Sequence, residues 1–107
     1  MEWLDITDHG LNQLLAMCGP GLKVLNAKNT WIRGEHVTVT CARLESLNLA
    51  GCMNVADAGL NVMLGKLGAN LRCLNLGATE VSGADIEASC PHLENLRDGN
   101  IRVVVIV

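Results

Sequence analysis

The sequence predicts an α/β solenoid, in which short parallel strands line a concave face and helices cover a convex face. Two observations predict this fold class: the chain aligns with itself, and a leucine motif recurs within each aligned unit. The composition agrees, because 17 of the 107 residues are Leu and none is Phe or Tyr. A stack of thin, similar layers requires such an aliphatic core, and the length allows one domain.

The self-alignment is free of gaps. An offset of 49 residues places residues 6–49 on residues 55–98 and gives 15 identities in 44 positions. The matched pairs include Asp8 with Asp57 and Cys41 with Cys90. Internal duplication is the simplest explanation.

A finer period lies within each 49-residue unit. The motif LxxL begins at residues 22, 44, 71 and 93, so its starts are separated by 22, 27 and 22 residues. These are the lengths of leucine-rich repeats. The fullest copy runs from Leu44 to Cys52 and fits the pattern LxxLxLxx(N/C). We therefore predict a right-handed leucine-rich-repeat solenoid of three to four repeats over residues 1–100.

Each repeat is expected to contribute one strand and one helix. Leu47 and Leu49 alternate with Ser46, Asn48 and Ala50, as in a short strand with one buried face. Helical spacing of apolar residues occurs over residues 10–18, 37–41, 60–67 and 86–90. Ser82 and Asp85 have the spacing of a capping box before the last helix.

Both ends of such a stack need covering. The tail, residues 101–107, is apolar and strongly strand-forming, and we expect it to form a C-terminal cap. Two alternatives remain open: an exposed edge through which the solenoid ends self-associate, or an end without an evolved role. At the N-terminus, Trp3 and Leu4 are expected to plug the first helix.

The repeat units resemble the cysteine-containing class of leucine-rich repeats. Residues 6–11, Ile-Thr-Asp-His-Gly-Leu, match the ITDxGL segment of that class, and residues 89–93, Ser-Cys-Pro-His-Leu, match its CPxL segment. The resemblance covers residues 6 to about 98. The sequence departs from the class at Thr30 and Thr79, which replace its recurrent cysteine, and at residues 68–69, where Cys-Pro is expected.

The resemblance implies a function. The class is best known from F-box/leucine-rich-repeat proteins, whose repeats capture substrates for a ubiquitin ligase, and it also occurs in adaptors and assembly factors. Only a few residues precede the first predicted helix, so the chain is expected to represent the substrate-recognition repeats without an F-box. The alternatives are a ligase-independent adaptor or assembly factor, and a truncated isoform without independent function.

The candidate contact surface is the concave strand face. Strands stacked in register would align Asn26, Asn48, Asn75 and Arg97 as a polar stripe that can bind a peptide backbone or a carboxylate. One flank of the stripe carries Val24, Ser46, Cys73 and Asn95, and the other carries Lys28, Ala50, Gly77 and Gly99. The alternative is that these asparagines are tolerated on a solvated strand face and pair with one another.

Other classes of function find less support in the sequence. We expect no enzyme, cofactor or metal site, because the three histidines and five cysteines lack metal-ligand spacing and no thiol has a paired base nearby in sequence. The net charge of −3 argues against nucleic acid. No apolar run reaches the length of a membrane span or secretory signal, and the odd number of cysteines indicates free thiols, so a cytoplasmic or nuclear location is expected.

Overall fold

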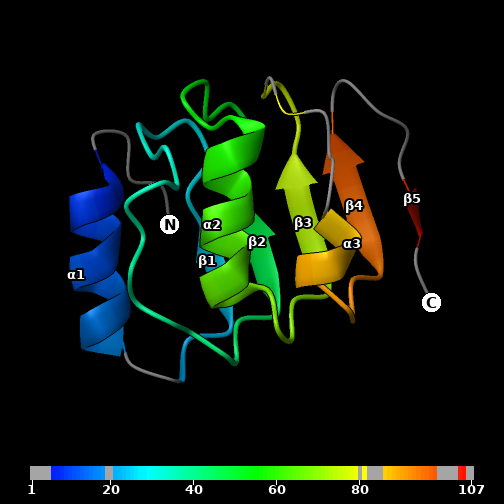
Figure 1. Cartoon of the computed structure of the whole chain (residues 1–107), viewed down its shortest axis with the longest axis horizontal. Helices are drawn as coiled ribbons and strands as arrows, with labels where there is room; N and C mark the ends of the chain where they lie inside the picture. Colours follow the sequence, from blue (N-terminus) through cyan, green and yellow to red (C-terminus); the bar gives the residue numbers. More distant parts are fainter. Residues whose placement is uncertain (1–5, 19–20, 80, 82–85, 99–103, 106–107) are drawn as a thin grey trace.

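Parallel strands in chain order form the centre of the molecule. The structure, a computed structural model, describes residues 6–18, 21–79, 81, 86–98 and 104–105. Strands β1 to β4 pair in parallel in the order in which they occur along the chain, and β5 pairs antiparallel with β4. Their bounds are Val24–Asn26, Ser46–Asn48, Cys73–Leu76, Asn95–Asp98 and Val104–Val105. Helices lie on one face of this sheet (Figure 1).

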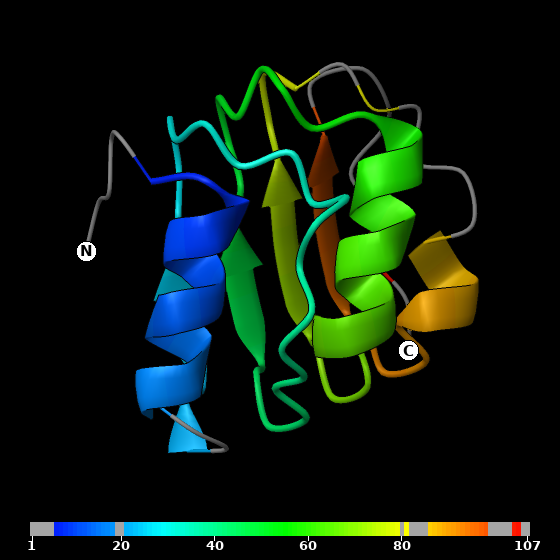
Figure 2. The ribbon, with the colours of Figure 1, turned by 60° about the vertical axis from the view of Figure 1, so that its left-hand side comes forward.

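The leucines of the recurrent motif build the core. Leu25, Leu47, Leu74 and Leu96 pair in register across β1 to β4, and each is at most 5% exposed. Because side chains alternate along a strand, the neighbours of these leucines point to the opposite face. Figure 2 shows the helices over one face of the sheet, and the burial of these leucines places their side chains on that face. The fold is therefore an α/β arrangement with a four-stranded parallel sheet.

Three of the four predicted helices are present in the structure. Helix α1 spans Asp8–Cys18, α2 spans Asp57–Leu67 and the short α3 spans Ile86–Ser89. Helices α1 and α2 start at corresponding aspartates of the two 49-residue units, as the self-alignment predicts. The proposed capping box at residues 82 and 85 lies outside the described residues.

The predicted helix over residues 37–41 is wrong. This segment is extended, and it runs between α1 and α2 (Figure 2). Four consecutive β-branched residues, 37–40, disfavour a helix there, whereas the corresponding stretch of the second unit reads Ile-Glu-Ala-Ser and is helical. Side chains from α1 also bind the backbone of this segment and compete with helical hydrogen bonds.

Two side chains of α1 hold this extended segment and the turn that precedes it at residues 34–36. The Asp8 carboxylate, only 6% exposed, accepts hydrogen bonds from the backbone N–H groups of Arg33, Gly34 and His36 at 2.9, 3.0 and 2.9 Å. The Asn12 side chain accepts from the N–H groups of Thr38 and Val39 at 2.9 and 3.4 Å and donates to the His36 carbonyl oxygen at 2.9 Å. Besides starting a helix, Asp8 therefore fixes the path of the following repeat.

A left-handed backbone residue follows three of the strands. Asn29, Gly51 and Ala78 stand at corresponding repeat positions and have φ values of 58°, 74° and 58°. The Asn29 N–H donates to the Ala50 carbonyl oxygen and the Gly51 N–H to that of Gly77, both at 2.8 Å. The same turn therefore follows each of these three strands, as the 22- and 27-residue spacings suggest.

The recurrent cysteine position is buried whether it holds Cys or Thr. Cys52 donates to the Ala27 carbonyl oxygen of the preceding layer at 3.1 Å. Thr30 and Thr79 instead donate to a carbonyl oxygen three residues back in their own layer, at 2.9 and 2.6 Å. Cys52 therefore links two repeats, and Thr30 takes part in the same link, because its Oγ1 lies 3.4 Å from Cys52 Sγ.

Two residues of the tail form a strand at the edge of the sheet, and the role of the tail as a cap stays a prediction. Val104 and Val105 pair with Leu96 and Asn95, respectively, in antiparallel orientation. The remainder of the tail and the expected plug at Trp3 and Leu4 lie outside the described residues. Among the helices that the structure describes, none combines the length and apolarity needed to cross a membrane.

Candidate functional site

The outward face of the sheet carries the predicted rows of side chains. Strand pairing aligns Asn26 with Asn48 and Asn75, and aligns Val24 with Ser46, Cys73 and Asn95. Arg97 pairs with Asn75 in the same register, although its side chain lies outside the described part of the structure. The register is the predicted one, and the role of these residues in partner binding stays a prediction.

The three asparagines share a side-chain conformation that sequence reasoning missed. The side-chain oxygens of Asn26, Asn48 and Asn75 accept hydrogen bonds from the backbone N–H groups two residues further on, at 3.2, 3.0 and 2.9 Å. This is the local Asx turn, which ends a strand and turns the chain. The partner is an N–H group, so the oxygen of each amide must face the backbone and the Nδ2 group must face away from it.

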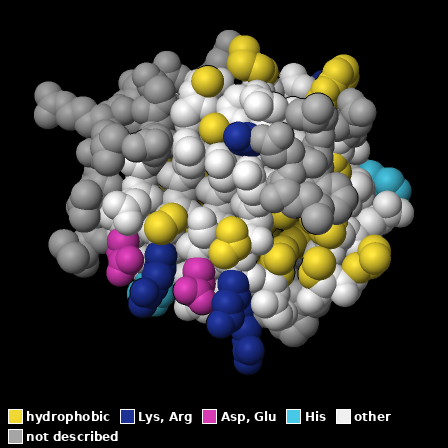
Figure 3. Space-filling model, turned by 180° about the vertical axis from the view of Figure 1, so that it is seen from behind, with side chains coloured by type: hydrophobic (Ala, Val, Ile, Leu, Met, Phe, Trp, Pro, Cys, Tyr) yellow, Lys and Arg dark blue, Asp and Glu magenta, His cyan; other side chains and the backbone are white. Residues whose placement is uncertain are grey.

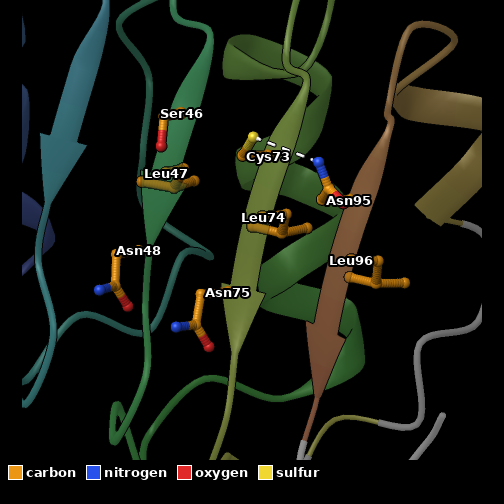
Figure 4. Close-up of a pocket in the computed structure, with 8 residues that line it drawn as sticks. All are labelled: Ser46, Leu47, Asn48, Cys73, Leu74, Asn75, Asn95 and Leu96. Atoms are coloured by element: carbon orange, nitrogen blue, oxygen red, sulfur yellow. Dashed lines mark hydrogen bonds between the residues drawn. The ribbon is translucent and has the colours of Figure 1, made fainter. Parts of the chain in front are cut away.

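The Nδ2 groups of Asn26, Asn48 and Asn75 have no hydrogen-bond partner among the described residues. They do not pair with one another, so the alternative of a self-satisfied asparagine ladder finds no support here. In Figure 4 the amides of Asn48 and Asn75 project from adjacent strands in the same direction. Neighbouring strands are about 4.8 Å apart, so the three asparagines form a row of donors with that spacing.

A shallow hollow lies beside this row. It has a volume of about 360 Å³ and is lined by side chains of β2, β3 and β4, among them Ser46, Cys73 and Asn95 (Figure 4). Asn95 Nδ2 is 3.9 Å from Cys73 Sγ, which is a weak contact for a hydrogen bond. Val24 of β1 stands in the same row as Ser46, Cys73 and Asn95. It is 65% exposed and offers an apolar surface at the end of that row.

The second flank of the asparagine row consists mainly of small residues. Lys28, Ala50 and Gly77 follow the three asparagines at the same repeat position. A Cβ atom on Gly77 would lie 3.2 Å from Asn75 Oδ1, so a larger residue there would press on the Asx turn. Gly99, the fourth member of this flank, lies outside the described residues. Ala50 and Gly77 are small, so the amides of Asn48 and Asn75 are accessible from this side.

Charges of alternating sign line one rim of the same face. Lys23, Glu45, Arg72 and Glu94 occupy corresponding positions just before the four strands, and successive members are linked by backbone N–H to carbonyl hydrogen bonds of 2.8 Å. Figure 3 shows basic and acidic side chains alternating along this rim. The self-alignment contains the signal, because Glu45 matches Glu94 and Lys23 matches Arg72. Neighbouring opposite charges cancel at a distance, so the rim does not select a partner by net charge.

The thiols differ in accessibility. Cys41, Cys52 and Cys90 are buried, Cys73 is half-buried and Cys18 is exposed. Cys41 and Cys90 therefore belong to the core, whereas Cys18 ends α1 at the surface. Burial raises the pKa of the Cys90 thiol to about 11, which keeps it protonated at neutral pH. Cys18 and Cys73 are the thiols that solvent reaches.

Metal-ligating side chains do not gather within the described residues: no group of three or more His, Cys, Asp or Glu is placed to hold an ion. The arrangement that remains is a surface of directed amide donors beside a shallow hollow. Such a surface can bind carbonyl or carboxylate oxygens of an extended chain. Comparison with protein-family models, curated proteins and solved structures found no match for this chain.

Proposed function

We propose that the chain is a leucine-rich-repeat module that binds proteins through the outward face of its parallel sheet. The observation that carries this proposal is the row of Asn26, Asn48 and Asn75, whose Nδ2 donors have no partner among the described residues. An extended partner segment that crosses the strands would offer its carbonyl oxygens to these donors, while the hollow accepts a side chain.

Within this proposal, substrate recognition for an F-box-type ubiquitin ligase is the first choice. It is supported by the resemblance of residues 6 to about 98 to the cysteine-containing repeats of such receptors. A ligase-independent adaptor or assembly factor is the second candidate, because the resemblance rests on the repeats alone. Both candidates use the same face, so they share the first test and differ in the second.

The first test replaces the donor and keeps the turn. In Asn48→Asp, a carboxylate oxygen can still accept from the Ala50 N–H, but the Nδ2 donor is replaced by a negative charge that repels carbonyl and carboxylate oxygens. We expect quantitative pull-down from cell extract to show loss of partner capture by Asn48→Asp and by Asn48→Asp/Asn75→Asp. Asn54→Asp introduces the same charge at an exposed position outside the rows and should capture partners normally. Undiminished capture by the double variant would refute the role of the amide row.

The second test separates the two candidates. Expression of the chain in cells should shield a ligase substrate from its receptor, so the half-life of captured partners should lengthen with the parent chain and not with Asn48→Asp. A ligase-independent adaptor would leave those half-lives unchanged while still capturing the same partners. Cycloheximide chase of the captured proteins provides the measurement.

A further inference from the structure

The charged rim, Lys23, Glu45, Arg72 and Glu94, has a fixed order of signs. These residues stand directly before β1, β2, β3 and β4, so the order from β1 to β4 is plus, minus, plus, minus. Glu45 is half-buried, and the other three side chains are exposed along one edge of the molecule (Figure 3). None of the four side chains forms an ion pair or hydrogen bond with a residue that the structure describes. The four charges are therefore available to a partner.

The order of signs in the rim is complementary to itself. Read from β4 to β1 it is minus, plus, minus, plus. A second copy related by a two-fold axis perpendicular to the outward face of the sheet presents its rim in this reversed direction, so that β1 faces β4 of the second copy and β2 faces β3. Lys23 then meets Glu94 of the second copy, and Arg72 meets Glu45 of the second copy. A two-fold axis along the stacking direction would instead bring like charges together.

A second row, two positions before the rim, fits the same two-fold relation. It consists of Gly21, Arg43, Asn70 and His92, and side chains of both rows line a hollow of about 520 Å³. Arg43 would face Asn70 of the second copy. The Asn70 Nδ2 group donates to the Ala42 carbonyl oxygen at 2.6 Å, which leaves its Oδ1 to accept from a guanidinium group. No atom lies within 4 Å of the place of a Cβ atom on Gly21, so His92 of the second copy has room there.

We propose that two copies of the chain associate edge to edge through these rims, with the two charge rows antiparallel. The two-fold axis keeps the outward faces of both sheets on the same side, so both amide rows stay exposed, and the inference does not rest on the proposed function. Exposed ion pairs contribute little each and are screened by salt, so the dimer is weak and dissociates as the ionic strength rises. This contact differs from self-association through the ends of the solenoid, because the rim crosses all four parallel strands.

Sedimentation equilibrium of the full chain tests the proposal. The parent chain should dimerise in about 0.01 M salt, where the screening length is about 30 Å, and be monomeric in about 1 M salt, where it is about 3 Å. Arg72→Glu places two carboxylates opposite each other in both central contacts and should weaken association by at least about tenfold. Glu45→Lys is the matching cationic variant with the same expectation. Arg33→Glu changes the net charge as Arg72→Glu does, at an exposed position outside the rim, and should dimerise like the parent chain.

Exchange of the two central charges separates pairing between copies from pairing within one rim. In Glu45→Lys/Arg72→Glu the order is plus, plus, minus, minus, which is again complementary to itself, although neighbouring strands now carry like charges. This double variant should dimerise like the parent chain. An equimolar mixture of Glu45→Lys and Arg72→Glu should form a mixed dimer although neither variant associates alone, and the mixture serves as the test if circular dichroism shows that the double variant does not fold.

Three results would overturn the proposal. The first is a parent chain that stays monomeric in about 0.01 M salt up to a concentration of about 1 mM. The second is a folded double variant that does not dimerise, or a mixture that does not associate, since the rim charges would then act only within one copy. The third is association that neither salt nor Arg72→Glu weakens, which would assign the contact to the ends of the solenoid.

Discussion

Helices α1 and α2 begin with the same signals and end in different surroundings. Each has 11 residues, starts with Asp and continues with Gly-Leu-Asn at corresponding positions. Helix α1 buries Asp8, Leu11 and Leu15, whereas α2 buries Gly59, Leu60, Met63, Leu64 and Leu67. Among the residues that the structure describes, α2 has chain on both sides and α1 on one. The position of a helix along the stack therefore determines how many of its residues are buried in the core.

The largest test of this comparison is truncation of a matched apolar pair. Met63→Ala removes a fully buried side chain and should lower the free energy of unfolding by about 3 kcal/mol through lost burial and a residual cavity. Leu14→Ala removes the half-buried side chain at the matched position of α1, and the loss should be about 1 kcal/mol. Urea denaturation followed by circular dichroism measures both values.

If Leu14→Ala proved as destabilising as Met63→Ala, the outer face of α1 would be covered in solution, and the comparison would break at its main point. Leu11→Ala serves as the control for α1 itself, because Leu11 is 1% exposed and faces the core. It should destabilise the fold about as much as Met63→Ala, which shows that α1 is docked and that only its outer face is open.

The second test adds a Cβ atom to each of two matched glycines, Gly59 and Gly10. Gly59→Ala places a Cβ atom against the backbone carbonyl of Arg33, which cannot rotate away, so we expect a loss of about 2 kcal/mol from overpacking. Gly10→Ala places its Cβ atom 2.8 Å from Ile6 Cγ1, and the half-buried Ile6 side chain can move. Alanine also favours the helix by up to about 1 kcal/mol, so Gly10→Ala should leave stability nearly unchanged.

Thermal denaturation of the two glycine variants gives the measurement. A nearly unchanged melting temperature for Gly10→Ala and a fall for Gly59→Ala is the expected pair of results. Equal falls would mean that a rigid group sits over Gly10 as it does over Gly59, and the two helices would then be equally covered at this position.

The strands and their register could be predicted because the period of the leucines defines both. Leu25, Leu47, Leu74 and Leu96 stand four residues into successive LxxL motifs, and equal motifs stack in equal register. The predicted helix over residues 37–41 failed because it rested on the helical spacing of the apolar residues Val37 and Cys41. It gave no weight to the four β-branched residues or to the side chains of α1 that bind this segment.

The candidate site could be predicted only in part for a similar reason. Alternation along the strands puts Asn26, Asn48 and Asn75 on one face, and the structure agrees. Which amide atom faces outward depends on a turn two residues later, which the period of the leucines does not describe. Knowledge of the Asx turn would have found it, since each asparagine stands at the end of a strand.

The smallest expected effect reverses the comparison, because here the first unit is the sensitive one. Asn12 and Asn61 are matched by the 49-residue offset. Asn12 makes three hydrogen bonds to the extended segment, whereas Asn61 Oδ1 is buried without a hydrogen-bond partner in the described structure. In the second unit, the residues that correspond to Thr38 and Val39 lie in helix α3. The backbone N–H groups that Asn12 binds in the first unit therefore have helical counterparts in the second.

We therefore expect Asn12→Ala to lower the free energy of unfolding by about 1 kcal/mol, since water replaces part of the lost bonds at this exposed position. Asn61→Ala removes an unsatisfied buried oxygen and should be neutral or stabilising by up to about 1 kcal/mol. Asn12→Asp keeps an acceptor for Thr38 and Val39 and should recover part of the loss. Chemical denaturation of all three variants under the same conditions measures these changes in the free energy of unfolding. If Asn61→Ala destabilised as much as Asn12→Ala, the second unit would hold its loop as the first does, and the divergence between the two units would be confined to the open face of α1.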